Sequence, residues 1–432
     1  MNLFVAAKQK LLTGSSFRKD VLWTVMTQFL VMLLAFGITK IASNILTVDE
    51  FGQYNVVRRS VSVISFVMLS GMGITLPRYL AIYQGARQYR KMVDLICCSL
   101  FFVGIVCAIL VVVASLFSGT LMQYVTGDSN GTLYWLALAF AFSTSMSALL
   151  IAYYRGVNDF KNYSITQVAF QFLLLLSLLF IPRQNVNAVF LLWSISTFAF
   201  TVIYFIYENH KNRSIVFRAY RGSNFGGMMK TIAVYSSPRL VGDFLLFSFS
   251  AYPVLYLSQV MTMSDVAYYS VGMTIINMAT PFFSFLGVVL LPYVSGAMSN
   301  GRFSEARRLI RRLSSWYLIL ALVLTLVFWL FMPFLIRLFF SPDYVVSKDI
   351  SRAMLLSVLP QSMYLLYRNP IDAISTIPYN TVILLVSCVV LIVLFSFSNT
   401  LSDYAYSFVC ASFVQGGLSM LVWMIINKKI KD

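Results

Sequence analysis

Long apolar segments alternate with short polar loops along the whole chain. About 20 apolar residues cross the hydrocarbon core of a bilayer as a helix, and the segments have this length. The pattern predicts an all-α polytopic membrane protein with twelve transmembrane helices. The expected spans are 21–45, 55–77, 92–117, 133–154, 164–182, 188–207, 231–258, 267–293, 314–334, 351–369, 379–397 and 404–426.

The composition agrees with this prediction, and the residue types present argue against several classes of function. The 432 residues are 59% hydrophobic and 11% charged, whereas soluble domains are about 25% charged. The sequence has no Walker-type nucleotide loop, no intramembrane carboxylate pair and no Ser-His-Asp set, so we expect a protein that is not an enzyme and needs no cofactor. The five cysteines lie in apolar segments and His210, the only histidine, lies in a polar loop, so no metal site or disulfide framework is expected.

The formal net charge of +17 comes from basic residues that gather in alternate loops. With the N-terminus in the cytoplasm, three quarters of the 32 lysines and arginines fall on that side, while the outward loop 118–131 has none. Cytoplasmic loops carry such an excess, so we expect both termini in the cytoplasm. Topology therefore accounts for the charge, and no nucleic-acid-binding motif accompanies it.

The twelve spans divide into two halves of six. A shift of 215 residues aligns positions at the same point of each half, in the pairs Thr47/Thr262, Glu50/Asp265 and Tyr54/Tyr269. Because six is even, the halves share one orientation and are related by a pseudo-two-fold axis along the membrane normal. The expected parts are a cytoplasmic segment 1–20, an N-lobe 21–207, a basic linker 208–230, a C-lobe 231–426 and a cytoplasmic tail 427–432.

The seventh span carries two opposite charges within its apolar run. Arg239 and Asp243 are four residues apart, so on a helix they share a face and can pair. A charge at the centre of a membrane helix costs about 2.5–3.5 kcal/mol on insertion scales, and such residues usually face a bundle interior or a wet cavity. We predict that this helix lines a polar path. The two residues serve either as a structural ion pair or as a substrate site whose acid takes part in ion coupling.

Three further basic residues lie inside predicted spans and are candidates for the same path. Lys40 is late in the first span, and Arg58 and Arg59 lie a few residues below the outer end of the second. Arginine suits a phosphate because its planar fork holds two oxygens and stays charged. Neighbouring positions point about 100° apart on a helix, so one arginine can face a cavity while the other snorkels, as Lys40 also can. Which one faces the cavity is left open.

Weaker candidates are uncharged or lie at a span end. The glutamines among them can meet sugar hydroxyls, although contact between helices is their commoner use. The tyrosines can stack on sugars, and Arg352 begins the tenth span, where an interfacial anchor is the simpler interpretation. These weaker candidates are Gln28, Gln167, Gln171, Tyr235, Tyr252 and Arg352.

Five motifs next to loops follow one another along the chain. They are ASNILTVDEFGQYNVV (42–57), SGMGITLPRYLA (70–81), AYYRGVNDFKNYSITQ (152–167), LLPYVSGAMSNGRFSEARRLIRR (290–312) and MPFLIRLFFSPDYVVSKDISRAMLLSVL (332–359). In order and spacing they resemble the Wzx-type O-antigen or polysaccharide repeat-unit flippases of the MATE-like MOP exporter superfamily. One departure is that Phe and Ser in LFFSPDY replace the glycine usual in that family.

This resemblance implies two six-helix bundles around a central cationic cavity that opens by alternating access. The implied cargo is an oligosaccharide unit on undecaprenyl or another polyprenyl diphosphate, flipped from the cytoplasmic to the periplasmic leaflet of the bacterial inner membrane for O-antigen and lipopolysaccharide biosynthesis. The implied partners are this lipid-linked oligosaccharide, membrane lipids, a coupling H⁺ or Na⁺ and a polysaccharide polymerase complex.

Three other functions stay open from the sequence. A lipid II-type flippase would share the fold, but the resemblance implies two extra spans for that family. An exporter of cationic drugs needs acidic cavity residues, and Asp94 is the only other clear acid within a span. A membrane polysaccharide polymerase or ligase works in large outward loops rich in Arg and His, whereas the outward loops here are short and lack histidine.

Overall fold

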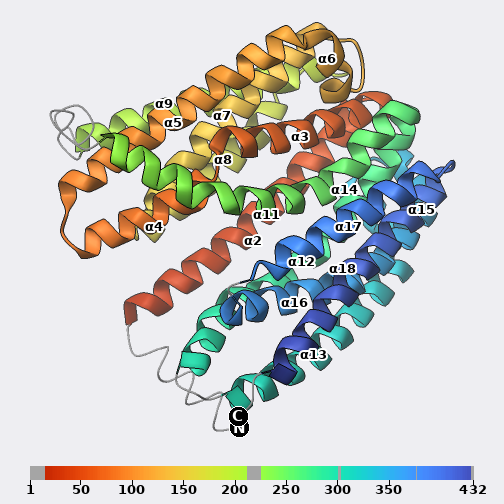
Figure 1. Cartoon of the computed structure of the whole chain (residues 1–432). Coiled ribbons are helices and arrows are strands. Elements are labelled where there is room, and N and C mark those ends of the chain that lie inside the picture. Colours follow the sequence, from red (N-terminus) through yellow and green to blue (C-terminus); the bar gives the residue numbers. More distant parts are fainter. Residues whose placement is uncertain (1–14, 212–224, 300–302, 376, 430–432) are drawn as a thin grey trace. The chain divides into compact units, whose positions relative to one another are not determined.

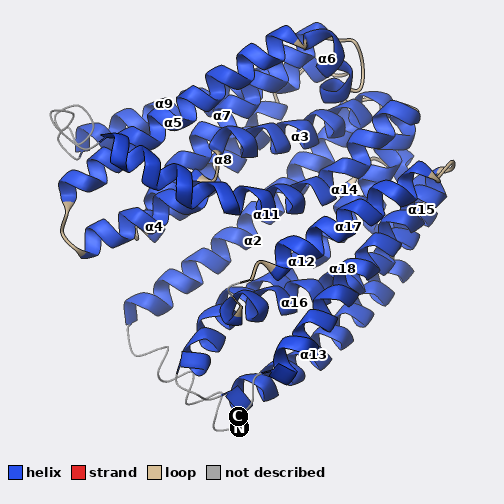
Figure 2. Ribbon diagram, viewed as in Figure 1, coloured by secondary structure: helices blue, strands red, loops and turns tan. Residues whose placement is uncertain are grey.

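The computed structural model describes residues 15–211, 225–299, 303–375 and 377–429, and every regular element within these ranges is a helix (Figures 1 and 2). The helices of the first half are α2 (Ser15–Ile45), α3 (Val48–Leu69), α4 (Met72–Gly85), α5 (Tyr89–Leu116), α6 (Ser118–Thr126), α7 (Gly131–Gly156), α8 (Phe160–Leu178) and α9 (Val186–Lys211). Those of the second half are α11 (Phe225–Val260), α12 (Met263–Ser299), α13 (Phe303–Leu330), α14 (Met332–Phe339), η1 (Pro342–Ser347), α15 (Lys348–Met354), η2 (Leu355–Ser357), α16 (Val358–Ile374), α17 (Tyr379–Ser396) and α18 (Leu401–Lys429).

Each of the twelve predicted spans is mostly helical in the described chain, although the second runs over α3 and α4 and the tenth over α15, η2 and α16. Within the described residues, eight helical segments are long and apolar enough to cross a membrane, in α2, α3 with α4, α5, α7, α9, α13, α17 and α18. The remaining four predicted spans lie on α8, α11, α12 and α16, and α16 is the shortest of them at 17 residues. The prediction of an all-α membrane protein is therefore confirmed.

The chain divides into two compact units. Unit 1 comprises Met1–Ile45, Ile64–Leu121 and Asn130–Leu240, and unit 2 comprises Leu46–Val63, Met122–Ser129 and Val241–Asp432. Most of each predicted lobe falls in one unit. However, the first part of α3 groups with unit 2, and the division in the middle of the chain falls inside α11 rather than in the linker 208–230. The predicted lobe boundaries stay a prediction.

The second predicted span is broken into α3 and α4. Ser70 and Gly71 between them have φ of 48° and 73°, and a left-handed backbone cannot continue a right-handed helix. The span also begins at Val48 rather than at residue 55. Arg58 and Arg59 therefore lie about 15 Å along α3 at a rise of about 1.5 Å per residue, and their position relative to the outer end of the span stays a prediction.

The same N-terminal cap opens α3 and α12. At α3 the Thr47 backbone N–H donates to Glu50 Oε2 at 2.9 Å, and the Glu50 N–H donates to Thr47 Oγ1 at 3.2 Å. At α12 the Thr262 N–H donates to Asp265 Oδ2 at 3.3 Å, and the Asp265 N–H donates to Thr262 Oγ1 at 3.2 Å. Both are capping boxes. Two of the residue pairs aligned by the 215-residue shift thus make the same local structure.

Candidate functional site

Arg58 lies on the part of α3 that belongs to unit 2 and rests on the tyrosine one turn before it. Its Nη1 donates a hydrogen bond to Tyr54 Oη at 3.2 Å, and its guanidinium carbon lies 5.4 Å from the centre of the Tyr54 ring. Tyr54 is fully buried, while Arg58 is half-buried. The ring face attracts the cation, so Tyr54 restricts the Arg58 side chain and leaves its other N–H groups for a ligand.

Arg59 lies beside a tyrosine of α12 in the same unit. It interacts electrostatically with Tyr269, whose side chain is fully buried. Among the residues that the structure describes, the Tyr269 hydroxyl has no hydrogen-bond partner. Tyr54 and Tyr269 are the third pair that the 215-residue shift aligns, so each arginine has one of the two equivalent tyrosines as its neighbour. Neither tyrosine is among the site residues that the sequence predicts.

The two arginines form a site with an excess of positive charge. In the described part of the chain, no ion pair involves either of them, and each residue as a whole is half-buried. Guanidinium groups stay protonated and present N–H donors in pairs that match the oxygens of phosphate or carboxylate. Each arginine can therefore bind an anion, and whether both reach the same anion stays a prediction. Whether one of them snorkels stays a prediction.

Gly52 allows α3 to approach the start of α12 closely. A Cβ at this position would overlap the backbone carbonyl of Met263, so the contact requires glycine. Next to it, Ser264 Oγ donates a hydrogen bond to Asp49 Oδ1. Because Met263 and Tyr269 are within two turns on α12, this contact also fixes Tyr269 relative to Arg59.

Gly52→Ala is expected to lower the thermal stability of the purified protein. The added methyl group has to push α3 away from α12, and overpacking of this kind costs about 1–3 kcal/mol. Gly417 on α18 is the matched control, because a Cβ there meets no atom within 4 Å and alanine favours the helix. Thermal unfolding of both variants in one detergent tests the contact, and equal unfolding temperatures for the two would contradict it.

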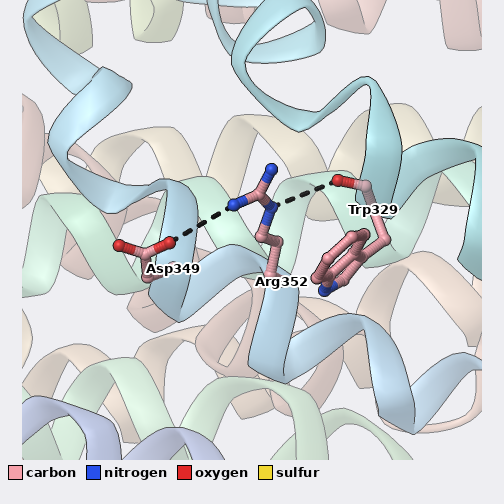
Figure 3. Close-up of polar contacts among 3 residues, drawn as sticks. All are labelled: Trp329, Asp349 and Arg352. Atoms are coloured by element: carbon pink, nitrogen blue, oxygen red, sulfur yellow. Dashed lines mark hydrogen bonds and ion pairs between the residues drawn. The ribbon is translucent and has the colours of Figure 1, made fainter.

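Arg352 is held in a small network at α15 (Figure 3). Its Nε donates to the carbonyl oxygen of Trp329 at 3.2 Å, and its guanidinium carbon lies 4.7 Å from the centre of the indole ring. Its Nη1 lies 3.5 Å from Asp349 Oδ1. The arginine thus satisfies a carbonyl at the end of α13 and links that helix to α15. This geometry favours the interpretation of Arg352 as an anchor.

Three of the other candidates in the described part, Gln28, Gln167 and Tyr252, contact neighbouring side chains. Gln28 Nε2 donates to Gln167 Oε1 at 2.9 Å, which joins α2 to α8 in unit 1, and Gln171 is half-buried one turn further along α8. The Tyr252 ring lies 5.5 Å from that of Tyr256 and 5.7 Å from that of Phe395 in unit 2. Lys40 is half-buried near the end of α2.

Three predicted site residues lie on α11 with side chains outside the part that the structure describes. They are Tyr235, Arg239 and Asp243. The backbone of α11 is helical from Phe225 to Val260, so Arg239 and Asp243 are about one turn apart, as the spacing predicts. Their pairing and their role stay predictions.

A family model decides the identity of the chain. Residues 17–298 match the model of a family described as polysaccharide biosynthesis protein. The chain belongs to this family. A second model, MatE, matches residues 238–398. Membership in the polysaccharide biosynthesis protein family and the MatE match confirm the resemblance that the five motifs carry. A search of curated proteins found no match.

Solved structures of MOP superfamily transporters share the fold of this family member. An inward-facing multidrug resistance MATE family transporter is 13% identical with a TM-score of 0.78, over 93% of this chain and 96% of that chain. An outward-facing one is 14% identical with a TM-score of 0.64, over 96% and 97%. A MOP superfamily transporter from Pyrococcus furiosus is 13% identical with a TM-score of 0.62, over 96% and 97%. The polysaccharide biosynthesis protein thus has the fold of a multi-pass membrane transporter.

Proposed function

We propose that the protein flips an oligosaccharide unit linked to polyprenyl diphosphate from the cytoplasmic to the periplasmic leaflet of the bacterial inner membrane, by alternating access. The observation that carries the proposal is the pair Arg58 and Arg59, which lies about 15 Å along a membrane-spanning helix without an ion-pair partner among the described residues. Membership in the polysaccharide biosynthesis protein family supports the class of cargo.

The chemistry of the cargo matches this pair of cations. A lipid-linked oligosaccharide is polar and carries its negative charge at the diphosphate that joins sugar to lipid. Each arginine at membrane depth costs about 2.5–3.5 kcal/mol on insertion scales, and a diphosphate that binds both offsets part of this cost. The polyprenyl tail can remain in the bilayer while the arginines hold the diphosphate and the sugars cross in water.

Arg239 and Asp243 belong to the same proposal as a second polar position. Arg239 adds a cation for the diphosphate, and Asp243 supplies a group that H⁺ or Na⁺ can neutralise. Since the sequence has no nucleotide-binding loop, an ion gradient, the membrane potential or removal of the cargo on the far side drives transport. We further propose that both termini are cytoplasmic and that a polysaccharide polymerase complex receives the flipped unit, as for O-antigen in lipopolysaccharide biosynthesis.

Deletion of the gene is expected to trap lipid-linked oligosaccharide in the cytoplasmic leaflet. The sugars cannot cross the hydrocarbon core unaided, so surface polysaccharide is lost while the precursor accumulates. The leaflet is identified by treating intact and opened cells with an enzyme that modifies the glycan. Plasmid-borne wild-type protein restores export and serves as the control.

Other outcomes of the deletion would assign a different function. Precursor or shortened glycan accumulating on the periplasmic side would favour a polymerase or ligase. Accumulation of lipid II alone would favour a lipid II-type flippase. Unchanged glycans with increased sensitivity to cationic drugs would favour a drug exporter. Each of these results contradicts the proposal.

A further inference from the structure

Unit 1 contains a cavity of about 300 Å³ that is lined by residues of α4, α5, α7 and α9. These four helices are labelled in Figure 1. Apolar side chains from all four helices line it, among them Leu76, Leu100, Leu149 and Phe205. Along α9 the lining extends from Phe198 to Glu208, which is about 15 Å at a rise of about 1.5 Å per residue. One leaflet is half of a hydrocarbon core about 30 Å thick. The cavity therefore has the length of a single lipid chain in one leaflet.

One wall of the cavity borders the exterior of the protein. Phe198 and Val202 line the cavity and are 45% and 38% exposed. The next residue on α9, Ile203, is 65% exposed. A membrane-spanning helix that is apolar on its outer side presents that side to lipid. A lipid chain can thus enter the cavity sideways from the bilayer, past α9.

The far end of the cavity is polar. Glu208 lines it, is only 9% exposed, and interacts electrostatically with Tyr153 and Tyr154 at the end of α7. An ionised carboxylate has two oxygens with about four acceptor positions, so Glu208 can accept hydrogen bonds in addition to its contacts with the tyrosines. In the predicted topology α9 ends on the cytoplasmic side, which places this carboxylate at the level of the cytoplasmic headgroups.

We propose that this cavity binds one acyl chain of a phospholipid of the cytoplasmic leaflet whose headgroup carries a primary ammonium. The apolar walls take up the chain, and because the chain passes from one apolar environment to another, van der Waals packing rather than the hydrophobic effect holds it there. The Glu208 carboxylate accepts charge-assisted hydrogen bonds from the ammonium. The same carboxylate repels headgroups of net negative charge, so it disfavours anionic lipids and the diphosphate of the proposed cargo, whereas the phosphate of the zwitterionic lipid is balanced by its own ammonium. This lipid site lies in unit 1, whereas Arg58 and Arg59 belong to unit 2.

The proposal is tested by lipid binding to the full-length protein in detergent, followed by native mass spectrometry. Phosphatidylethanolamine, phosphatidylcholine and phosphatidylglycerol with the same acyl chains are the probes. The wild type is expected to retain one phosphatidylethanolamine molecule with an affinity about tenfold or more above the other two lipids, since a hydrogen bond to a charged group is worth about 1.5–3 kcal/mol.

One variant tests how the headgroup contributes to binding, and a matched pair of variants tests how the acyl chain contributes. Glu208→Gln keeps the shape of the site and is expected to bind the three lipids about equally. Val202→Trp fills the entrance from the bilayer and is expected to lose the retained lipid, whereas Ile203→Trp, one residue further on the exposed side, is expected to keep it. Both tryptophan positions are partly exposed to the exterior, so the fold tolerates the larger side chain.

Several results would overturn the proposal. Equal affinity of the wild type for the three lipids would show that the site does not recognise the ammonium. A preference for phosphatidylethanolamine that persists in Glu208→Gln would show that the Glu208 carboxylate does not bind the ammonium. Retention of a polyprenyl phosphate in place of phospholipid, lost in Val202→Trp, would assign the cavity to the tail of the cargo instead.

Discussion

Replacing Arg58 and Arg59 together by alanine is expected to reduce transport of lipid-linked oligosaccharide by about a hundredfold or more, with the protein still folded in the membrane. Each arginine offers the diphosphate a charge-assisted contact worth about 1.5–3 kcal/mol, and loss of two such contacts corresponds to this factor. Stability is expected to fall by about 1–3 kcal/mol, because the variant loses the hydrogen bond from Arg58 to the buried Tyr54 hydroxyl, and removal of two charges from a membrane helix offsets part of this loss.

The double variant with lysine at both positions tests why arginine is present. Lysine keeps the charge but lacks the planar fork, so it is expected to retain part of the transport. Arg183→Ala is the matched control, because this arginine is exposed in the loop between α8 and α9. Transport is measured in reconstituted vesicles, with unfolding temperature as the test of folding. Wild-type transport by the folded alanine double variant would contradict the cation site.

The transmembrane helices could be predicted from sequence because each is a long apolar run, but the start of the second could not. Its first turn contains Asp49 and Glu50, and Asn55 follows, so a search for apolar residues starts too late. Glu50 belongs instead to the cap of the helix, through its hydrogen bond to the Thr47 N–H at 2.9 Å. The pattern S/T-x-x-E is the local signal that predicts this start.

The charged half of the candidate site could be predicted, while its aromatic half could not. Arg58 and Arg59 stand out because charges are rare in membrane spans. Nothing in the sequence around Tyr54 and Tyr269 distinguishes them from the other tyrosines among the 25 in the chain. Only their tertiary contacts identify them as neighbours of the two arginines. The internal repeat was the available signal, since the shift that aligns the two capping boxes also aligns these tyrosines.

Two further features depend on contacts between distant segments. The close approach at Gly52 depends on the path of the Met263 backbone, which no local pattern records. Glu208 lies in the stretch YENHKN, which has the composition of a polar loop. In the structure it is buried at the end of α9 because Tyr153 and Tyr154 of α7 lie against it. A carboxylate at a cavity end was therefore not predictable from one sequence.

Arg239→Ala is expected to stop export of the lipid-linked oligosaccharide, and Arg239→Lys is expected to keep part of it. Arg239 lies within the helical stretch Phe225–Val260, about 21 Å from its start at a rise of about 1.5 Å per residue. A cation at such a position is usually functional in a membrane protein. Export is measured as surface polysaccharide in cells without the chromosomal gene, with the amount of protein in the membrane as the control.

The double variant Arg239→Ala with Asp243→Ala distinguishes substrate binding from a structural ion pair. In a structural pair, loss of one partner leaves an uncompensated buried charge and costs about 3–5 kcal/mol, whereas loss of both removes that penalty. The double variant would then regain both its stability and its export. If Arg239 binds the diphosphate, the double variant is folded and still fails to export. The stability change of the double variant minus the sum of the changes of the two single variants measures the energy of the pairing itself. Wild-type export by the double variant would contradict a role for Arg239 in holding the cargo.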